Sequence, residues 1–558
     1  MKKIISITLL FTFGILANAQ SAYDALKLSE TNYEGTARTV AMGNAFTALG
    51  GDLGSITINP AGSAVAGYSQ FAITPSLTFS TSTTQGVSPY DDGTLPYFER
   101  KMKSGMTRFS IPNIGMTFNW ETGRKSGLKS MTFGVIINKT GGWDEDVYAN
   151  GINNTTSFMG GLAAATTLLM EDYNAALLPG EAPYTYIDLT GEEAYDYMPW
   201  KNVIGYQSGM ISTFGGHDDQ FVGASEQIFS NPNTGIDEIT LGGALDQTYG
   251  RRVTGSKYDY IFNLGANISD FLYLGANIGV SSLEYDYSEY FKEAAIDPGN
   301  FEISFDDGSS MCFKNMKYNY SYNAEASGLF AKIGFIATPA SWLRIGGAIQ
   351  TPTRNTIIEE WRMSGTTEFS DSKYNGSASS PYGEDRYTII SPMKANLGLA
   401  LTFGSLGLIS ADYEMCNYGA MKFKGDSESR SYFDSINQDI QDMFGTAHSF
   451  RAGLEVKPLS SLAVRAGYNI TGSGEKRNAW GDDLDPVYTQ NASFGLGYSS
   501  KGSFFADLAV RKTFMPDEYF MPYEDYIYDD KGYVSTPVPE ILKQQSLWKV
   551  FLTFGWRF

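Results

Sequence analysis

The sequence has little cysteine and little histidine, with two residues of each among 558. Cys312 and Cys416 are too few for a disulfide scaffold or a metal cluster, and either one disulfide or two unpaired thiols fit the count. His217 and His448 give a hydrolase triad few side chains to use, and Ser449, beside His448, would point to the opposite face of a strand. We therefore expect no enzyme activity, no metal site and no cofactor.

Basic residues and long apolar runs are also scarce. The chain has 41 Lys and Arg against 61 Asp and Glu, which gives a formal charge of -20. So acidic a chain is not expected to bind nucleic acid or to adhere to anionic lipid through a basic face. After residue 16 no stretch offers the ~18 consecutive uncharged apolar residues of a transmembrane helix, so we expect no helical membrane domain.

The chain begins with the features of a secretory signal peptide. Residues 1–3 are MKK, residues 4–16 form an apolar run, and residues 17–19 read ANA, a small-residue cleavage site. We predict a signal peptide over residues 1–19 and a mature chain that begins at Gln20. No cysteine follows the cleavage site, so a lipoprotein anchor is not expected. The apolar run is shorter than the ~20 residues that an uncleaved membrane anchor needs.

Glycine and aromatic residues are plentiful, with 60 Gly, 36 Tyr and 35 Phe, a composition that suits sheet more than helix. The clearest pattern is SLWKVFLTFGWRF at residues 546–558, which alternates between an apolar and a polar face. The apolar face carries Trp548, Val550, Leu552, Phe554, Trp556 and Phe558. Aromatic residues near both ends of such a face are typical of membrane barrels.

The same alternation recurs along the chain and predicts fourteen strands. We place them at 69–81, 108–120, 129–139, 257–268, 271–288, 316–337, 341–362, 385–403, 406–423, 447–457, 461–472, 487–500, 503–514 and 546–558. The second face of these strands is rich in Gly, Asn and charge, which suits the wet interior of a closed barrel. Only helices and closed barrels pair every backbone group in lipid. The sequence therefore predicts an all-β, fourteen-stranded antiparallel transmembrane β-barrel over residues 69–558.

The expected connections alternate between short turns and long loops, as in barrels whose short turns are periplasmic and whose long loops are external. Both ends of the chain then lie on the periplasmic side. The longest connection, 140–256, is expected to be an extracellular insertion. Short helices are predicted within it at 157–178 and 191–206.

Residues 20–68 precede the first expected strand and are rich in small residues interrupted by Gly and Pro. A segment of this length can fold into the lumen as a hatch, or plug, and take its core from the barrel wall. Asn59, Pro60, Ala61 and Gly62 predict a rigid turn within it, because Asn caps turns and Pro fixes φ. We expect this turn to have a structural and gating role.

This combination resembles the FadL/TodX-like family of outer-membrane transporters for long-chain fatty acids and hydrocarbons. The resemblance rests on TARTVAMGNAFTALGGDLGSITINPAG at residues 36–62, in which Asn59, Pro60, Ala61 and Gly62 match the hatch motif of the family. The signal peptide, the strand count and the terminal Phe558 agree with it. The long 140–256 insertion departs from the family pattern, which leaves the ligand open.

The resemblance implies passive uptake of hydrophobic small molecules, either long-chain fatty acids or aromatic hydrocarbons. They would dock at external loops, pass a hatch-gated barrel and leave sideways through a gap in its wall. Pro75 and Pro112, which cannot donate a backbone N–H to a ladder, are the candidate wall-gap residues, although prolines at a barrel rim are an alternative.

The resemblance also implies a monomer in the outer membrane of a Gram-negative cell. Its expected surroundings are outer-membrane lipid and lipopolysaccharide, and the barrel-assembly machinery is expected to recognise the strand that ends in Phe558.

Inward-facing cations give the last candidate site. Lys394, Arg451 and Arg465 are candidate ligands for the head group of a fatty acid, and Arg511 and Lys549 face the same way. The alternative interpretation is a set of salt bridges across the lumen. The alternative function is a FadL-like barrel that binds secreted or surface partners, or that takes up haem.

Overall fold

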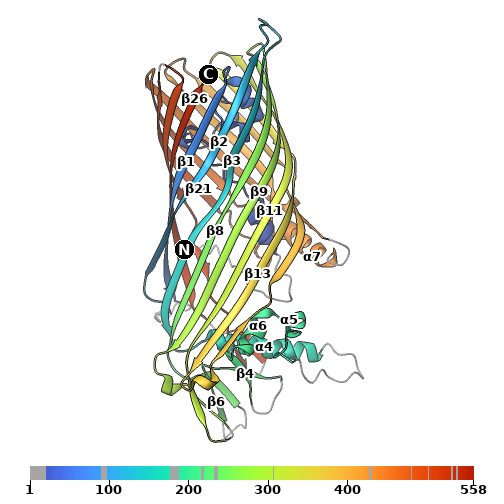
Figure 1. The fold of residues 1–558 in the computed structure, drawn as a ribbon, viewed down its shortest axis with the longest axis vertical. Coiled ribbons are helices and arrows are strands. Elements are labelled where there is room, and N and C mark those ends of the chain that lie inside the picture. The colour runs from blue at the N-terminus through green and yellow to red at the C-terminus, as the bar shows by residue number, and fades with distance from the viewer. Residues whose placement is uncertain are drawn as a thin grey trace.

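The chain forms a long closed β-barrel (Figure 1). The computed structural model describes residues 21–88, 97–175, 188–214, 219–230, 237–305, 307–425, 430–478, 481–500, 502–529, 532–535 and 538–558. Strand β1 (Gln70–Val87) pairs antiparallel with both β2 (Met102–Glu121) and β26 (Glu540–Arg557), which closes the sheet. The prediction of a fourteen-stranded antiparallel barrel is confirmed.

The other wall strands follow in chain order around the barrel. They are β3 (Leu128–Asn153), β8 (Leu245–Ile268), β9 (Leu272–Ala295), β11 (Ser310–Ala340), β12 with β13 (Leu343–Gln350, Thr353–Phe369), β15 with β16 (Gly383–Ser391, Lys394–Thr402), β17 with β18 (Gly407–Asn417, Lys422–Lys424), β19 (Thr446–Leu459), β20 (Leu462–Gly472), β21 (Tyr488–Ser499) and β22 (Phe504–Phe514). Pro352 and Pro392 separate the first two of these double strands, because proline cannot donate to the ladder.

A band of exposed apolar side chains surrounds the barrel. Successive strands contribute Leu77, Phe109, Phe133, Phe262, Ile278, Ile333, Leu397, Phe450, Phe494 and Trp548, all of them exposed. Near the short turns the band ends in aromatic residues that include Trp120, Trp342, Phe403 and Phe558. A closed barrel with an outward apolar band flanked by aromatic residues is the architecture of outer-membrane proteins, and this chain is one of them.

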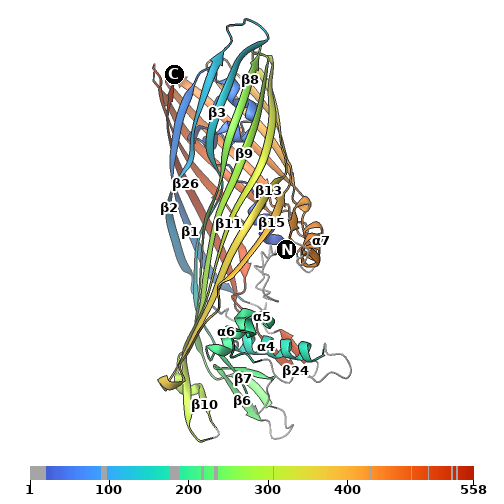
Figure 2. The same ribbon diagram turned by 45° about the vertical axis from the view of Figure 1, so that its right-hand side comes forward.

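On one side the wall extends far beyond this band. Within β9 the exposed large apolar side chains end at Val280, and within β11 they end at Leu329. Both strands nevertheless continue, to Ala295 and back to Ser310. Figure 2 shows β9, β11 and β13 running past α7 (Arg430–Met443) toward a group of helices at the far end. These strands form a stalk that stands outside the membrane.

The insertion between β3 and β8 is shorter than the sequence suggested. The two strands stay paired up to Asn153 and Leu245, so residues 154–244 form the connection. Outward positions of this extension are mostly polar, with Ile152 an exposed exception, and the apolar alternation that marks membrane strands therefore stops before the strands do. The connection contains α4 (Phe158–Ala175), α5 (Ala194–Tyr197), α6 (Trp200–Gln207), β4 (Ile211–Thr213), β5 (Phe221–Gly223), β6 (Glu226–Ser230) and β7 (Asp237–Leu241).

The remaining described elements outside the first 68 residues are short. They are η2 (Pro298–Asn300), β10 (Glu302–Ser304), η3 (Ser372–Tyr374), β14 (Gly376–Ser379), η4 (Tyr418–Ala420), β23 (Glu518–Phe520), β24 (Tyr526–Asp529) and β25 (Gly532–Ser535). Among the described helices, none is both long enough and apolar enough to cross a membrane. Cys312 and Cys416 are both free thiols, so the pairing that the sequence left open does not form.

Candidate functional site

Residues 21–68, called here the N-terminal segment, lie inside the ring of strands in Figure 1 and Figure 2. The segment contains α1 (Ala22–Ser29), α2 (Ala37–Ala41), α3 (Ser55–Ile58) and the 3-10 helix η1 (Pro60–Val65). Helices this short depend on side chains that satisfy their free N–H groups. Ser21 and Asp24 form a capping box on α1, and Thr36 accepts a hydrogen bond at the start of α2.

The Asn-Pro-Ala-Gly turn is fixed to two strands of the wall. Asn59 is fully buried, and its Nδ2 donates to the carbonyl oxygens of Thr47 (2.6 Å) and of Phe335 on β11 (2.9 Å). Its Oδ1 accepts from the Ala61 N–H (3.1 Å). The Pro60 carbonyl accepts from Asn263 Nδ2 of β8 (3.0 Å). Both polar atoms of the Asn59 side chain are therefore used, two of its hydrogen bonds within the segment and one to the wall.

Inward-facing glycines of the wall let the N-terminal segment approach the strand backbones. A Cβ on Gly275 would lie 2.2 Å from the Pro60 carbonyl carbon, and a Cβ on Gly467 would lie 2.1 Å from the Gly43 nitrogen. The same tight approach to the segment occurs at Gly265, Gly334, Gly346, Gly398, Gly453 and Gly495. Side chains at these positions would push the segment away, so the glycine-rich inner face is shaped to the segment.

A buried carboxylate anchors the middle of the segment. Glu34 is 1% exposed and forms ion pairs with Arg511 of β22 (3.0 Å), Lys139 of β3 (3.8 Å) and Lys549 of β26. Asp144 lies 3.8 Å from Lys549 and adds a second negative charge at the edge of the cluster. One residue of the segment thereby joins three wall strands, and these cations depend on it for their charge balance.

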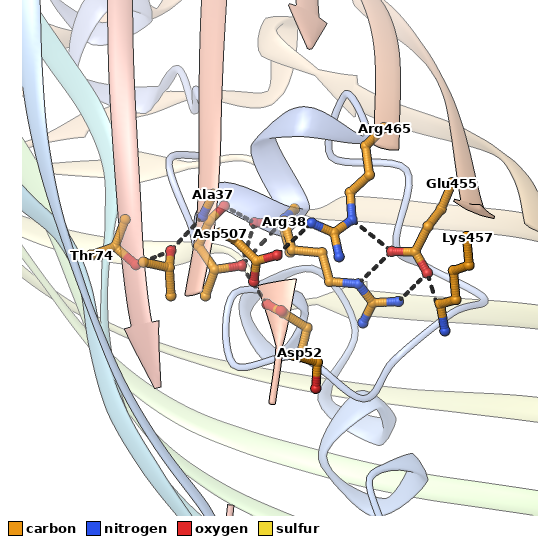
Figure 3. Close-up of polar contacts among 12 residues, drawn as sticks. Ala37, Arg38, Asp52, Thr74, Glu455, Lys457, Arg465 and Asp507 are labelled. Atoms are coloured by element: carbon orange, nitrogen blue, oxygen red, sulfur yellow. Dashed lines mark hydrogen bonds and ion pairs between the residues drawn. The ribbon is translucent and has the colours of Figure 1, made fainter. Parts of the chain in front are cut away.

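A second ionic network holds α2, as Figure 3 shows. Arg38 Nε donates to Glu455 Oε2 (2.9 Å), and Arg465 Nε donates to the same oxygen (2.6 Å). Arg465 also pairs with Asp507 of β22. On the segment itself Asp52 accepts from Thr36 Oγ1 (2.6 Å). Charged groups on β19, β20 and β22 therefore converge on a single helix of the segment.

The three predicted head-group residues are all buried, and all three already have partners. Lys394 Nζ donates to the Ser29 carbonyl (3.5 Å) and to Thr31 Oγ1. Arg451 pairs with Glu414 (2.9 Å) and lies 4.9 Å from the centre of the Tyr33 ring. Arg465 belongs to the network around Glu455. The structure does not bring the three into one pocket, and their role toward a ligand stays a prediction.

The barrel wall is interrupted between β2 and β3. In the described ladders the two strands pair only from Asn113 with Asn138 to Glu121 with Ser130. The remainder of β2, residues 102–112, pairs with β1 alone. Pro112 stands where the pairing with β3 stops, and the β1–β2 register shifts across Pro75. Both candidate prolines thus lie at the interruption, and their role in an exit stays a prediction.

The N-terminal segment replaces β2 as the partner of β3 at this point. The Asn32 N–H donates to the Thr140 carbonyl (2.7 Å), and the Glu34 N–H donates to the Lys139 carbonyl (2.9 Å). The β3–β8 register shifts between Lys139 and Gly141, which marks a bulge at Thr140. Two carbonyls freed by the loss of the β2 ladder are thereby paired with the segment.

Farther along, β3 is held to β1 and β2 by side chains instead of a backbone ladder. Thr84 Oγ1 donates to the Tyr148 carbonyl (2.6 Å), and Ser104 Oγ donates to the Asp146 carbonyl (2.6 Å). Arg108 pairs with Asp144 (3.1 Å). Side-chain contacts of this kind break more readily than a continuous ladder, because each stands alone.

The lumen beyond the ionic networks is aromatic. One buried cluster combines α1 and α7 with Tyr285, Tyr387, Phe423 and other inward side chains. Tyr322 and Tyr387 donate from their hydroxyls to Glu359 Oε2, at 2.8 and 2.9 Å. The tyrosine rings therefore face the lumen while their polar ends are satisfied by a carboxylate.

The far end of the stalk anchors the first helix of the external connection. Glu293 accepts from the Phe158 N–H at the start of α4 (2.8 Å) and from Gln247 Nε2 (2.7 Å). Burial raises the pKa of Glu293 to about 7. Burial also raises the pKa of Glu226, on β6, to about 8. Both carboxyls lie beyond the apolar band.

The described residues give no support for a catalytic or metal-binding role of histidine. His448 Nδ1 is 2.7 Å from the Tyr413 hydroxyl, in an exposed pair on β17 and β19. His217 lies outside the described residues, as do the signal-peptide residues 1–19. No group of three or more His, Cys, Asp or Glu side chains that suits a metal ion occurs in the described part of the chain.

Sequence reasoning found part of this site and missed its connections. Alternation placed Arg511 and Lys549 on the inner face, yet their partner Glu34 lies 477 residues from Arg511. The period-2 pattern shows which way a side chain points and contains no information about what it meets. The N-terminal segment has four acidic residues, Asp24, Glu30, Glu34 and Asp52, and the sequence pattern does not single out Glu34 among them.

We expect Glu34→Gln to loosen the N-terminal segment. Removal of one member of a buried ion pair costs about 3–5 kcal/mol, because it leaves uncompensated charge. Here Arg511 and Lys139 lose their carboxylate partner, and Lys549 keeps only Asp144 at 3.8 Å. Amide hydrogen exchange across residues 30–42 of the purified protein measures the effect. Glu325→Gln, at an exposed outward position of β11, is the matched control. Equal protection in both variants would contradict the anchoring role.

Comparison with known proteins gives matches in structure only. No protein-family model and no curated protein matches the sequence. A Pseudomonas aeruginosa FadL homologue has 11% identity and a TM-score of 0.48, over 94% of this chain and 99% of its own. The P. putida toluene transporter TodX has 10% identity and a TM-score of 0.47, over 94% and 98% of the two chains. The Ralstonia pickettii toluene transporter TbuX has 12% identity and a TM-score of 0.44, over 94% and 99%. These solved structures are those of the family whose hatch motif the sequence resembles.

Proposed function

We propose that this chain is an outer-membrane transport protein for passive uptake of hydrophobic small molecules, either long-chain fatty acids or aromatic hydrocarbons. Residues 20–68 would act as the hatch, and the interrupted pairing of β2 with β3 would be the lateral exit. The observation that carries the proposal is the depth of this interruption, which lies within the apolar band.

Exposed side chains next to the interruption establish its depth. Phe109 and Ile111 of β2 are 65% and 38% exposed, and Val135 of β3 is 56% exposed. At this depth no water can pair the backbone groups of a strand that separates from its neighbour. Unpaired backbone groups at this depth cost free energy, so we infer that the interruption serves a function. A passage from lumen to lipid suits an apolar cargo.

The contacts of the N-terminal segment favour a hatch over an open pore. The segment is joined to the wall by the Asn59 turn, by Glu34 and by the network around Arg38, so it obstructs the lumen. Its Asn32 and Glu34 N–H groups also bind β3 where the exit would open. Movement of residues 32–34 would therefore displace the plug and uncover the edge of β3 at the same time.

The buried cations Lys394 and Arg451 already have protein partners, and this affects which cargo can bind. A fatty-acid carboxylate would compete with Glu414 for Arg451, whose Nη1 has no hydrogen-bond partner among the described residues, and with Ser29 and Thr31 for Lys394. An uncharged hydrocarbon makes neither demand. Both classes therefore belong in the binding experiment.

The first test is the content of the purified barrel. We expect mass spectrometry of the detergent-solubilised protein to find a bound apolar molecule that exchanges with added hexadecanoate or toluene. An intact barrel that binds no exchangeable apolar molecule would overturn the proposed function.

The second test addresses the hatch. We expect the double variant Asn59→Ala, Pro60→Ala to loosen the turn, since buried groups left without their hydrogen bonds cost about 1–3 kcal/mol. Cells that carry this variant should leak nonspecifically and become more sensitive to large antibiotics. Ser63→Ala removes a single 3.3 Å hydrogen bond in the same helix and is the control. Wild-type sensitivity and uptake in the double variant would refute the gating role.

The third test addresses the exit. Alanine at Pro75 and Pro112 restores two backbone donors, and one further ladder bond is worth about 1 kcal/mol. This would favour a closed wall and slow the uptake of toluene by about fivefold. Pro458→Ala, at an exposed position beside a short turn, is the control. Uptake that is equal in the double variant and the control would argue for another route.

A further inference from the structure

A polar pocket lies on the outer face of the stalk, away from the lumen and the wall interruption. Its volume is about 360 Å³. The side chains that line it come from β9, β11, β13 and β14, and they include Ser288, Tyr290, Asn319, Ser321, Arg362 and Ser379. The proposed transport route does not use this pocket.

The pocket stands well outside the apolar band. On β9 the last exposed large apolar residue is Val280, and Ser288 follows about 26 Å farther along the strand at ~3.3 Å per residue. Outward positions between them are Ser282, Glu284 and Asp286. With the long connections on the external side, as the sequence predicts, the barrel at this height would face the sugar layer that covers the outer leaflet of the membrane.

Small hydroxyl side chains make the floor. Ser321 of β11 pairs in register with Ser288 on one side and with Arg362 on the other. Asn319 Nδ2 donates to Ser364 Oγ (3.2 Å) on the next strand. Short side chains on neighbouring strands leave a depression whose surface offers hydroxyl and amide groups.

Tyr290 forms one wall. Its ring packs against Gly250 of β8. A Cβ at Gly250 would lie 2.3 Å from the ring, so the glycine leaves the space that the ring occupies. The ammonium groups of Lys292 and Lys317 lie 5.3 and 5.5 Å from the ring centre. A fixed aromatic face flanked by cations is therefore part of the rim.

Arg362 forms the opposite wall and has an unused donor. Its guanidinium lies 4.6 Å from the centre of the Tyr382 ring, and Nη1 donates to the Tyr382 hydroxyl (3.0 Å). The Nε atom is buried and has no hydrogen-bond partner among the described residues. A planar guanidinium held by stacking is suited to pairing with a carboxylate or phosphate.

Cations and acidic groups meet at the pocket. Lys292, Lys317 and Arg362 gather around it, and the adjacent outward row nearer the membrane carries Asp286, Glu360 and Glu384. Glu289 also lines the pocket, and its carboxylate accepts from the Tyr249 and Tyr287 hydroxyls on the inner face. That carboxylate is therefore not free to compete for Arg362.

We propose that this pocket binds an acidic saccharide of the cell surface. A sugar ring would pack on Tyr290, its hydroxyls would bond to the serine and asparagine floor, and a phosphate or carboxylate substituent would pair with Arg362. The occupant we infer is the core oligosaccharide of neighbouring lipopolysaccharide, since the predicted orientation, with the long connections external, places this surface in that layer. Such binding would hold the stalk against the outer leaflet.

The test is a titration of the full-length protein in detergent with acyl-free core oligosaccharide of lipopolysaccharide that retains its acidic groups. Wild-type protein should bind it. Arg362→Gln should weaken binding about tenfold or more, and Ser321→Trp should abolish it by filling the floor. Arg354→Gln, an exposed arginine on the same strand and face, should bind as wild type does. Circular dichroism verifies the barrel in each variant.

Two further probes distinguish the chemistry. Maltoheptaose, a neutral oligosaccharide, and inorganic phosphate alone should each bind much more weakly than the acidic oligosaccharide. Equal binding of maltoheptaose, equal binding of phosphate, or no binding of the acidic oligosaccharide would each overturn the proposal. Unchanged binding in both Arg362→Gln and Ser321→Trp would do the same.

Discussion

The constraint on which this structure depends is that a backbone N–H or C=O group at membrane depth must be paired. Closure of β1 on β26 meets this constraint around the barrel. Among the described ladders, a marked departure at that depth is the separation of β2 from β3 beyond Asn113 and Asn138. There the chain uses its own N-terminal segment, through Asn32 and Glu34, to pair two of the carbonyls that the ladder leaves.

The fit of the N-terminal segment follows from small residues on both sides of the contact. Glycines such as Gly275 and Gly467 remove side chains from the inner wall, and the segment brings its backbone to within van der Waals distance of the strands. At such close range buried charges find partners, as Glu34 does with cations of three strands. Many local contacts therefore hold the segment in place together, and few of them would suffice alone.

The outer surface changes character along the strands. The apolar band ends near Val280 and Leu329, and the stalk beyond it has polar residues on its outer face. Strand geometry continues there because neighbouring strands still pair with each other, not because lipid requires it. The stalk thus adds surfaces that a shorter barrel would lack, among them the pocket beside Arg362 and the anchored helices of the external connection.

The sequence by itself determined the barrel. Alternation of the kind seen in residues 546–558 is a local property of a strand between lipid and lumen, so the fourteen strands and the short turns could be found without coordinates. The ends of β3 and β8 could not, because outside the membrane neither face has to be apolar. Only the tertiary structure decided which charges meet: Glu34 and Arg511 are neighbours because the barrel closes around the segment. It also decided that Lys394, Arg451 and Arg465 have protein partners, since a periodic pattern gives the direction of a side chain and not its contacts.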